Sequence, residues 1–399
     1  MRFISVPYLS LLFVIGFIFS CSEPYDFEDN SVAPILIVDG AITNLVKKHK
    51  IYLSRSYSFD GKPEMEPGAF VSIKSDKGEL FNFVDKGSEG YEAEKAFSAQ
   101  KDTHYTLHII TTDGSEYQST PMNLPNSSRL ESVTTLAEKN DRGEDGIAIY
   151  VNALSDSNDA RLYRFEYEET YKIIAPEWTP YDAVVIFEGI SAFSTNVILR
   201  ETEERVCYGT DNSKKIMLRS TKNQILDKID QERIRFIPIS DSKLMYRYSI
   251  LVRLLVESQE TYSYFETLQD LSVGSSSFFT EKQPGYIAGN VFNREDDKER
   301  VGGFFRVSAA SEKRIFFSLD DYYPDAPQPE YFTSCIKIAP TAEGTRGNRN
   351  LLNIIYSGYG RFYQYNSGEM PGGHYIFVNA PCGDCTVLGS NKRPIFWEP

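Results

Sequence analysis

Five cysteines are the residues of this 399-residue chain whose type and spacing most directly suggest chemistry. Two of them form a Cys-Gly-Asp-Cys motif at residues 382–385, near the C-terminus, and Cys207 and Cys335 stand apart from it. A Cys-x-x-Cys motif can be a redox-active pair, half of a zinc site or part of a disulfide framework. Each possibility makes different demands on the surrounding residues.

The residues around the motif favour structural disulfides. A redox-active pair normally begins a helix, where the thiolate is stabilised, but Pro381 and Gly383 predict a loop here. A zinc ion would need two further ligands, and the only candidates in the sequence are His374 and the distant cysteines. Four cysteines in an exported chain suggest two disulfides, with three possible connectivities. The simplest connectivity pairs Cys382 with Cys385 and Cys207 with Cys335.

The fifth cysteine, Cys21, follows a segment typical of a bacterial lipoprotein signal peptide. Arg2 precedes an apolar run over residues 6–19, and Ser20 supplies a small residue before the cysteine. The run is shorter than the ~20 residues that span a bilayer, but it fits the apolar core of a secretory signal. We expect residues 1–20 to be removed and Cys21 to carry acyl chains such as palmitate, which together anchor a protein stably. The alternative is an ordinary signal peptide that ends at a chance cysteine.

Residues 21–32 are expected to form an acidic tether. They are polar and poor in aliphatic side chains, a composition typical of unfolded linkers. Acidic residues such as Glu23 and Asp26, directly after a lipidated cysteine, resemble the surface-export signal of Bacteroidota lipoproteins. We therefore expect an outer-membrane location that faces the cell exterior. The alternative is a solvated linker that carries no export signal.

The remaining polar residues form no recognisable catalytic or metal-binding motif. The sequence holds no Gly-x-Ser-x-Gly elbow, P-loop or dinucleotide fingerprint. His104 and His108 lie in a predicted strand, where this spacing separates them by about 13 Å, too far to share a metal. Adjacent carboxylates such as Asp320 and Asp321 point to opposite faces of a strand. We expect no enzymatic activity, no metal and no cofactor.

The charge balance restricts the class of partner. Lys and Arg number 42 and Asp and Glu number 56, which gives a formal net charge of −14 at pH 7. A nucleic-acid binder needs a basic surface that replaces counterions, so we expect no nucleic-acid partner. The same charge argues against capture of an anionic polymer by simple field attraction. It permits a cationic, metal-chelate or neutral ligand, or a protein face.

Two segments rich in aromatic residues are candidate contact surfaces. The first is a loop over residues 320–331 that combines carboxylates, exposed tyrosines and prolines, a composition suited to binding. The second spans residues 356–365 and either packs into the core as a sheet face or forms an aromatic platform for a sugar or peptide. The residues proposed for contact are Asp320, Asp321, Tyr322, Tyr323, Asp325, Tyr331, Tyr359, Phe362 and Tyr363.

Short strands dominate the elements that must position these residues. Between residues 33 and 125, apolar runs alternate with turn signals such as Asp113-Gly114 at intervals of about ten residues, without a helical period. This pattern predicts an N-terminal antiparallel β-sandwich of the immunoglobulin-like or prealbumin-like kind. Prolines and serines near residues 122–130 indicate a domain boundary after residue 125.

The second predicted domain, residues 126–399, is larger and also β-rich, with one or two short helices. The segment 161–171 alternates charged with aromatic residues, which predicts a strand with one solvent-facing charged side and one apolar side. Ser258 is a suitable helix cap, and apolar residues follow at helical spacing to about Leu271. The sequence therefore predicts a mainly β protein of two domains.

Short motifs in a fixed order along the chain resemble a known family. They are CSEPY at 21–25, LIVDG at 36–40, LSRS at 53–56, GAFV at 68–71, YSILVR at 248–253, IAGNV at 287–291, CGDC at 382–385 and FW at 396–397. In these motifs the chain is similar to the domain of unknown function 4249 family, lipoproteins of Bacteroidota. The family has no assigned activity, so the resemblance supplies no catalytic residues. It implies an outer-membrane lipoprotein, often encoded beside a TonB-dependent transporter.

Together these observations predict a surface-exposed outer-membrane lipoprotein that acts as a non-enzymatic accessory or substrate-capturing partner of a TonB-dependent transporter. One alternative is a structural or assembly subunit of an outer-membrane complex. Another is a hydrolase of extracellular polymer, in which carboxylates distant in the sequence meet.

The lipid anchor yields the first testable prediction. Cys21→Ala removes the sulfur that would be acylated, so the protein should leave the membrane fraction or accumulate as an unprocessed precursor. Cell fractionation and mass spectrometry of the mature N-terminus measure both outcomes. An unmodified mature N-terminus on the unaltered protein would contradict lipidation.

Overall fold

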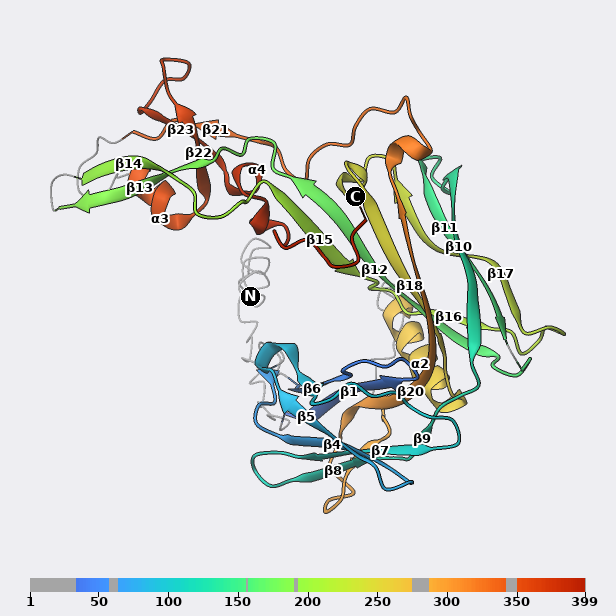
Figure 1. The fold of residues 1–399 in the computed structure, drawn as a ribbon. Helices are drawn as coiled ribbons and strands as arrows, with labels where there is room; N and C mark the ends of the chain where they lie inside the picture. The colour runs from blue at the N-terminus through green and yellow to red at the C-terminus, as the bar shows by residue number, and fades with distance from the viewer. Residues whose placement is uncertain are drawn as a thin grey trace, which may run out of the picture.

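Strands make up most of the structure, a computed structural model that describes residues 34–56, 64–155, 157–189, 193–274, 287–341 and 350–398. The predicted signal peptide, Cys21 and the acidic tether lie outside these residues. Figure 1 shows three parts arranged as an open letter C: an N-terminal lobe, a central sandwich and an arm. The expected mainly β fold class is confirmed.

The N-terminal lobe is a sandwich-like unit made from one continuous sheet with the order β20-β1-β2-β6-β5-β4-β7-β8-β19. In Figure 1 the part around β1 and β6 lies over the part around β4, β7 and β8. Alternate side chains such as Val38, Leu53 and Leu107 are buried between these layers, as a period of two requires. The strands are β1 Leu36–Thr43, β2 Lys50–Arg55, β3 Glu64–Met65, β4 Phe70–Ser75, β5 Leu80–Asp85, β6 Tyr91–Ala93, β7 His104–Ile110, β8 Glu116–Ser119, β9 Met122–Asn123 and β19 Val291–Asn293.

The central sandwich packs the sheet region β15-β12-β18-β20 against the sheet β10-β11-β17. The strand expected over residues 161–171 is confirmed as β12, and its Tyr163 and Phe165 enter the core beside Ile149 and Val252. The strands are β10 Ser128–Lys139, β11 Asp145–Ser155, β12 Leu162–Ile174, β15 Val206–Asn212, β16 Met217–Ser220, β17 Lys228–Pro238, β18 Tyr248–Val256 and β20 Gly302–Phe317.

The arm extends from the far end of the central sandwich (Figure 1). A hairpin and a three-stranded sheet enclose its small core of Ala183, Leu351, Phe362 and Phe377. Its elements are β13 Tyr181–Glu188, β14 Phe193–Leu199, β21 Lys337–Ile338, β22 Gly360–Tyr365, β23 Tyr375–Asn379, α3 Asn350–Ser357 and α4 Ala380–Gly383.

The helix expected after Ser258 is confirmed as α2, Gln259–Gly274. The Ser258 hydroxyl accepts a hydrogen bond from the backbone N–H of Thr261 at 3.1 Å, as a cap does. The second aromatic segment needs a correction: Tyr356 belongs to α3, and the strand starts only at Gly360. Eight apolar-rich residues can form either a helix or a strand, so periodicity did not separate the two.

Strand β20 belongs to both the lobe and the central sandwich. Gly302–Ser308 pair in parallel with Ile37–Thr43 of β1, and Ala309–Phe317 pair antiparallel with β18. The lobe core therefore includes Phe305 and Val307, which lie more than 170 residues after the domain boundary expected at residue 125. The domain division after residue 125 stays a prediction, but the two cores share this strand.

Gly303 in β20 provides a test of the shared strand. It has a φ of +88°, and a Cβ there would lie 1.9 Å from the backbone oxygen of Val38. Gly114 has a φ of +89° but nothing within 4 Å of its Cβ position. Gly114→Ala should therefore cost about 1 kcal/mol of unfolding free energy, and Gly303→Ala about 3 kcal/mol or more. Urea unfolding measures both, and equal losses would contradict the tight β1–β20 contact.

Candidate functional site

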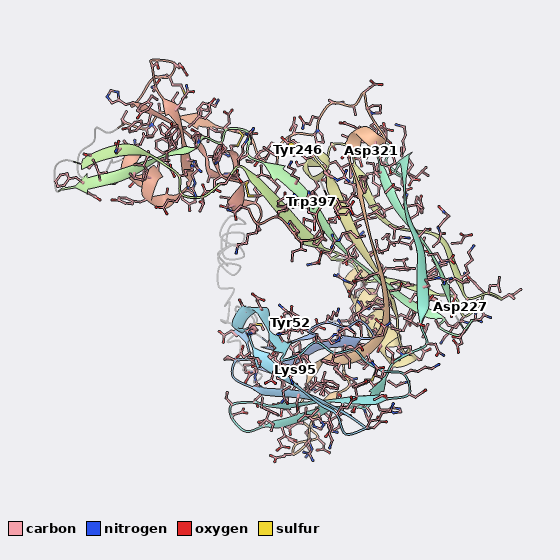
Figure 2. All side chains as sticks on the ribbon, viewed as in Figure 1. Tyr52, Lys95, Asp227, Tyr246, Asp321 and Trp397 are labelled. Atoms are coloured by element: carbon pink, nitrogen blue, oxygen red, sulfur yellow. A yellow bond between two sulfur atoms is a disulfide. The ribbon has the colours of Figure 1, made fainter. Side chains whose placement is uncertain are left out.

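A pocket of about 670 Å³ lies where the lobe meets the central sandwich. The outer faces of β1, β2 and β20 form its lobe side, β12 and β18 form its central side, and α2 borders both (Figure 1). In Figure 2, Tyr52 of β2 points from the lobe toward the concave side of the molecule. We call this the junction pocket. It is lined by Ile37, Val38, Asp39, Tyr52, Arg164, Phe165, Glu166, Tyr167, Asn212, Ser213, Lys214, Lys215, Ile216, Arg253, Tyr264, Phe265, Leu268, Gly303, Phe304 and Arg306.

The alternation of side chains along β12 supplies the charged wall of the pocket. Tyr163 and Phe165 belong to the central core, so the intervening Arg164 and Glu166 point to the other face. The charged face that the sequence predicted for this strand therefore exists. It borders a pocket as well as solvent.

Arg164 is held in place by buried partners. It is 5% exposed, and its Nε donates to Glu257 at 2.9 Å while Nη1 bonds Glu166. Glu257 in turn accepts from the Ser308 hydroxyl of β20 at 2.6 Å. The guanidinium of Arg164 lies 4.2 Å from the ring centre of Phe265 on α2. A charge that is nearly removed from water requires such pairing, and the contacts fix β12, β20 and α2 around the pocket.

Arg306 projects from β20 on the lobe side. Its Nη1 donates to Asp39 of β1 at 2.6 Å, and its guanidinium lies 5.4 Å from the Phe265 ring centre. The positive charge of Arg306 lowers the pKa of Asp39 below its ordinary value. Burial acts to lower the pKa of Arg306, but the carboxylates of Asp39, Glu166 and Glu257 together outweigh burial and the pKa rises. Burial likewise acts to raise the pKa of Glu166, but Arg164 and Arg306 outweigh it, so this pKa falls. All these groups stay charged at neutral pH.

Cations outnumber carboxylates in the lining. Its five cationic side chains are Arg164, Arg253, Arg306, Lys214 and Lys215, against the two carboxylates Asp39 and Glu166. Glu168 and Glu312 pair with Arg253 at 3.6 and 3.3 Å. Lys214 and Lys215 are exposed and form no ion pair within the part of the chain that the structure describes. The three arginines are therefore all paired with carboxylates, and the unpaired positive charge of the pocket is that of Lys214 and Lys215.

The tyrosines of the 320–331 loop do not form an exposed surface. Tyr322, Tyr323 and Tyr331 are partly buried against the central core. The Tyr323 hydroxyl donates to the Gly146 carbonyl at 3.1 Å, the Tyr331 hydroxyl donates to the Pro381 carbonyl at 2.8 Å, and Tyr322 bonds Thr135. The expectation of exposed tyrosines is wrong here, since their rings hold the loop in place. The carboxylates of this loop are exposed: Asp320, Asp321, Asp325 and Glu330.

The second aromatic segment is divided between core and surface. Phe362 is 2% exposed and belongs to the arm core, which matches the core-packing interpretation. Tyr363 is partly buried, with the ammonium of Lys337 4.1 Å from its ring centre. Tyr359 is 80% exposed. Of the three aromatic residues proposed for contact in this segment, only Tyr359 is freely accessible.

The expectation of two disulfides is confirmed, but the simplest pairing is wrong. Cys207 of β15 bonds Cys385, and Cys335 bonds Cys382 of α4. The motif is also not a plain loop: Pro381 lies in the first turn of α4, and Asp384 is extended before the next short turn. This extended residue separates the two turns, so the neighbouring cysteines reach different partners.

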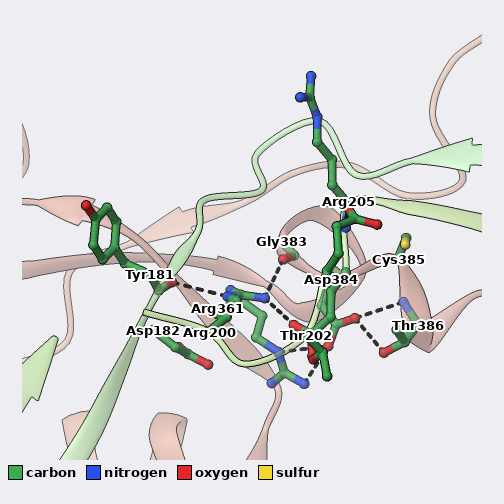
Figure 3. A network of polar contacts seen from close by, with 12 residues as sticks. Tyr181, Asp182, Arg200, Thr202, Arg205, Arg361, Gly383, Asp384, Cys385 and Thr386 are labelled. Atoms are coloured by element: carbon green, nitrogen blue, oxygen red, sulfur yellow. Dashed lines mark hydrogen bonds and ion pairs between the residues drawn. The ribbon is translucent and has the colours of Figure 1, made fainter. Parts of the chain in front are cut away.

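A polar network surrounds Asp384, next to Cys385 (Figure 3). Arg361 of β22 donates to one Asp384 oxygen from Nε at 3.0 Å and from Nη2 at 2.8 Å. The other oxygen accepts from the Thr386 backbone N–H at 2.8 Å. Arg200, after β14, bonds Glu204 and donates to the Gly383 carbonyl at 3.1 Å. The Cys207–Cys385 disulfide and these charged contacts together fasten the arm to β15, whereas Cys335–Cys382 lies within the arm.

The junction pocket was not identified from the sequence. Its cations come from β12, β18, β20 and the segment after β15, and only the fold brings them together. The one available signal was the alternation of charged residues over 161–171. Within the described residues, no group of His, Cys, Asp and Glu could hold a metal, and no helix is long and apolar enough to cross a membrane.

Comparison with known proteins identifies one family. The model of a family described as Domain of unknown function (DUF4249) matches residues 22–314. The motifs at 382–385 and 396–397 lie beyond the match. No curated protein matches the chain. Among solved structures, the B domain of a biofilm associated protein is 9% identical, with 73% of this chain and 86% of that chain covered. Its TM-score of 0.11 gives the likeness no weight.

The disulfide pairing can be tested by peptide mapping of unreduced protein. After digestion, a peptide that contains Cys382 and Cys385 should be linked to both the Cys207 and the Cys335 peptides. Mass spectrometry before and after reduction detects these links. A bond closed within residues 382–385 would contradict the structure.

Proposed function

This chain belongs to the DUF4249 family, and we propose that it is a surface-exposed outer-membrane lipoprotein that captures a ligand for a TonB-dependent transporter, without catalysis. The junction pocket carries this proposal. It has the size of small-molecule sites, about 300–1,000 Å³, and a mixed lining of aromatic and charged side chains suited to binding. Its position between two rigid cores gives a ligand a preformed site.

The charges of the pocket favour binding over hydrolysis. A general acid needs a raised pKa, but the pKa values of Asp39 and Glu166 both lie below their ordinary values. Each carboxylate is also paired with an arginine. These groups are suited to holding the arginines in position rather than to exchanging protons.

The arm is the proposed contact surface for the transporter. Large apolar side chains that are exposed to solvent mark interaction surfaces when many of them lie close together. On the arm they are Tyr181, Ile186, Phe187, Ile198, Leu199, Ile336, Ile338, Tyr356, Tyr359 and Tyr365. The same surface favours the second candidate function, a structural or assembly subunit, whose partner would be a larger complex.

A pull-down in mild detergent with a tag at the C-terminus tests the partner. Ile186→Ser with Phe187→Ser removes two arm side chains that are 63% and 59% exposed. The amount of copurified transporter should fall at least about tenfold, the effect of losing about 1.4 kcal/mol of contact energy. Because both side chains are exposed, the fold should be unaffected.

The matched control is Phe70→Ser with Leu80→Ser on the lobe, where the exposures are 53% and 59%. It should leave the complex intact. Recovery of the unaltered protein alone, at a copy number unrelated to any transporter, would contradict the proposal. Recovery of a large assembly without a channel would favour the structural alternative.

A further inference from the structure

We propose that the junction pocket binds a small molecule that carries carboxylate or phosphate groups beside a flat apolar body. This inference rests on the proposed function and names the ligand class of the same site. It differs from what the net charge of the chain suggests, because two lysines of the lining, Lys214 and Lys215, have no carboxylate partner among the described residues.

Local charge is the first argument. The three arginines of the lining are paired with carboxylates, so the unpaired charge of the pocket is that of Lys214 and Lys215, although the whole chain has a net charge of −14. Clefts with low-dielectric walls concentrate the field of the charges that line them. A small anion that enters the pocket experiences this local field, whereas an anionic polymer also meets the acidic remainder of the surface.

The geometry of the arginines is the second argument. Arg306 uses Nη1 for Asp39, and its other N–H groups form no hydrogen bond with the described residues. A guanidinium offers a planar set of donors that matches the oxygens of carboxylate and phosphate groups. Phe265 lies against both Arg306 and Arg164, at 5.4 and 4.2 Å, so the two guanidinium groups are ordered before a ligand arrives.

The rim and the aromatic side chains complete the site. Lys214 and Lys215 are exposed on the segment after β15 and can meet a charged group as it enters. Tyr264 and Phe304 pack together with ring centres 4.7 Å apart, and Tyr52 on the lobe side is 41% exposed. Phe304 is only 4% exposed and supports Tyr264, so Tyr264 and Tyr52 offer the surface for the uncharged part of a ligand. A cation is disfavoured by the same field that attracts an anion.

Titration calorimetry on the detergent-solubilised full-length protein tests the ligand class. The probes are AMP for phosphate, benzene-1,3,5-tricarboxylate for carboxylate, and adenosine as the neutral match of AMP. At least one anion should bind with a Kd below about 1 mM, and adenosine should bind at least about tenfold more weakly than AMP. The anion that binds more tightly identifies the preferred group.

Lys214→Glu with Lys215→Glu reverses two exposed charges and should weaken anion binding at least about tenfold. Lys77→Glu with Lys101→Glu makes the same charge change at exposed positions of the lobe outside the pocket lining and should leave the Kd unchanged. Absence of anion binding at about 10 mM would overturn the proposal. Equal binding of adenosine and AMP, or equal effects of the two double variants, would overturn it too.

The same preparations separate this inference from the proposed function. A transporter that copurifies while no anion binds would overturn the ligand class alone. Anion binding with the expected lysine dependence, but without a copurified transporter, would support the ligand class and contradict the partner.

Discussion

The double pairing of β20 is the constraint on which the rest of the structure depends. Seven of its residues continue the lobe sheet beside β1, and the following nine continue the central sheet beside β18. A strand is stiff when both of its halves are hydrogen-bonded, so the lobe and the central sandwich cannot turn freely about each other. The junction pocket lies at this joint and has walls fixed by the same strand.

Buried charges reinforce the joint. Arg164 on β12, Glu257 after β18 and Ser308 on β20 form a chain of contacts, with Glu257 only 2% exposed. Buried ion pairs contribute little net stability, because desolvation offsets their attraction. An unpaired charge in this place would be strongly unfavourable, however, so shifted strand registers are disfavoured. The network thus specifies one arrangement of the three strands.

The sequence predicted the local features of the fold well. The charged and aromatic alternation over residues 161–171 became β12, and the cap at Ser258 began α2, because both patterns arise from contacts between near neighbours. Disulfide formation was expected, but the extended backbone at Asp384 that directs the pairing has no sequence signal. The tyrosines of the 320–331 loop were expected at the surface, since composition does not reveal that a loop folds back on the core.

The pocket could not be predicted for a related reason. Arg164 and Arg306 are separated by more than 140 residues and meet only because β20 crosses between the cores. Pairing between strands that are distant along the chain leaves no periodicity in a single sequence. The net charge of the whole chain also does not reveal which charges line the junction pocket. That the unpaired Lys214 and Lys215 lie beside these arginines became visible only with the fold.

The parallel pairing of β1 with β20 also dictates the order in which the chain can mature. Synthesis proceeds from the N-terminus, so β1 emerges more than 250 residues before its partner Gly302–Ser308. Until then one edge of the first sheet is open, and open edges invite pairing with other chains. The Cys207–Cys385 bond, which spans 178 residues, closes later still. In a protein with this topology, only synthesis of most of the polypeptide closes this edge of the first-made sheet.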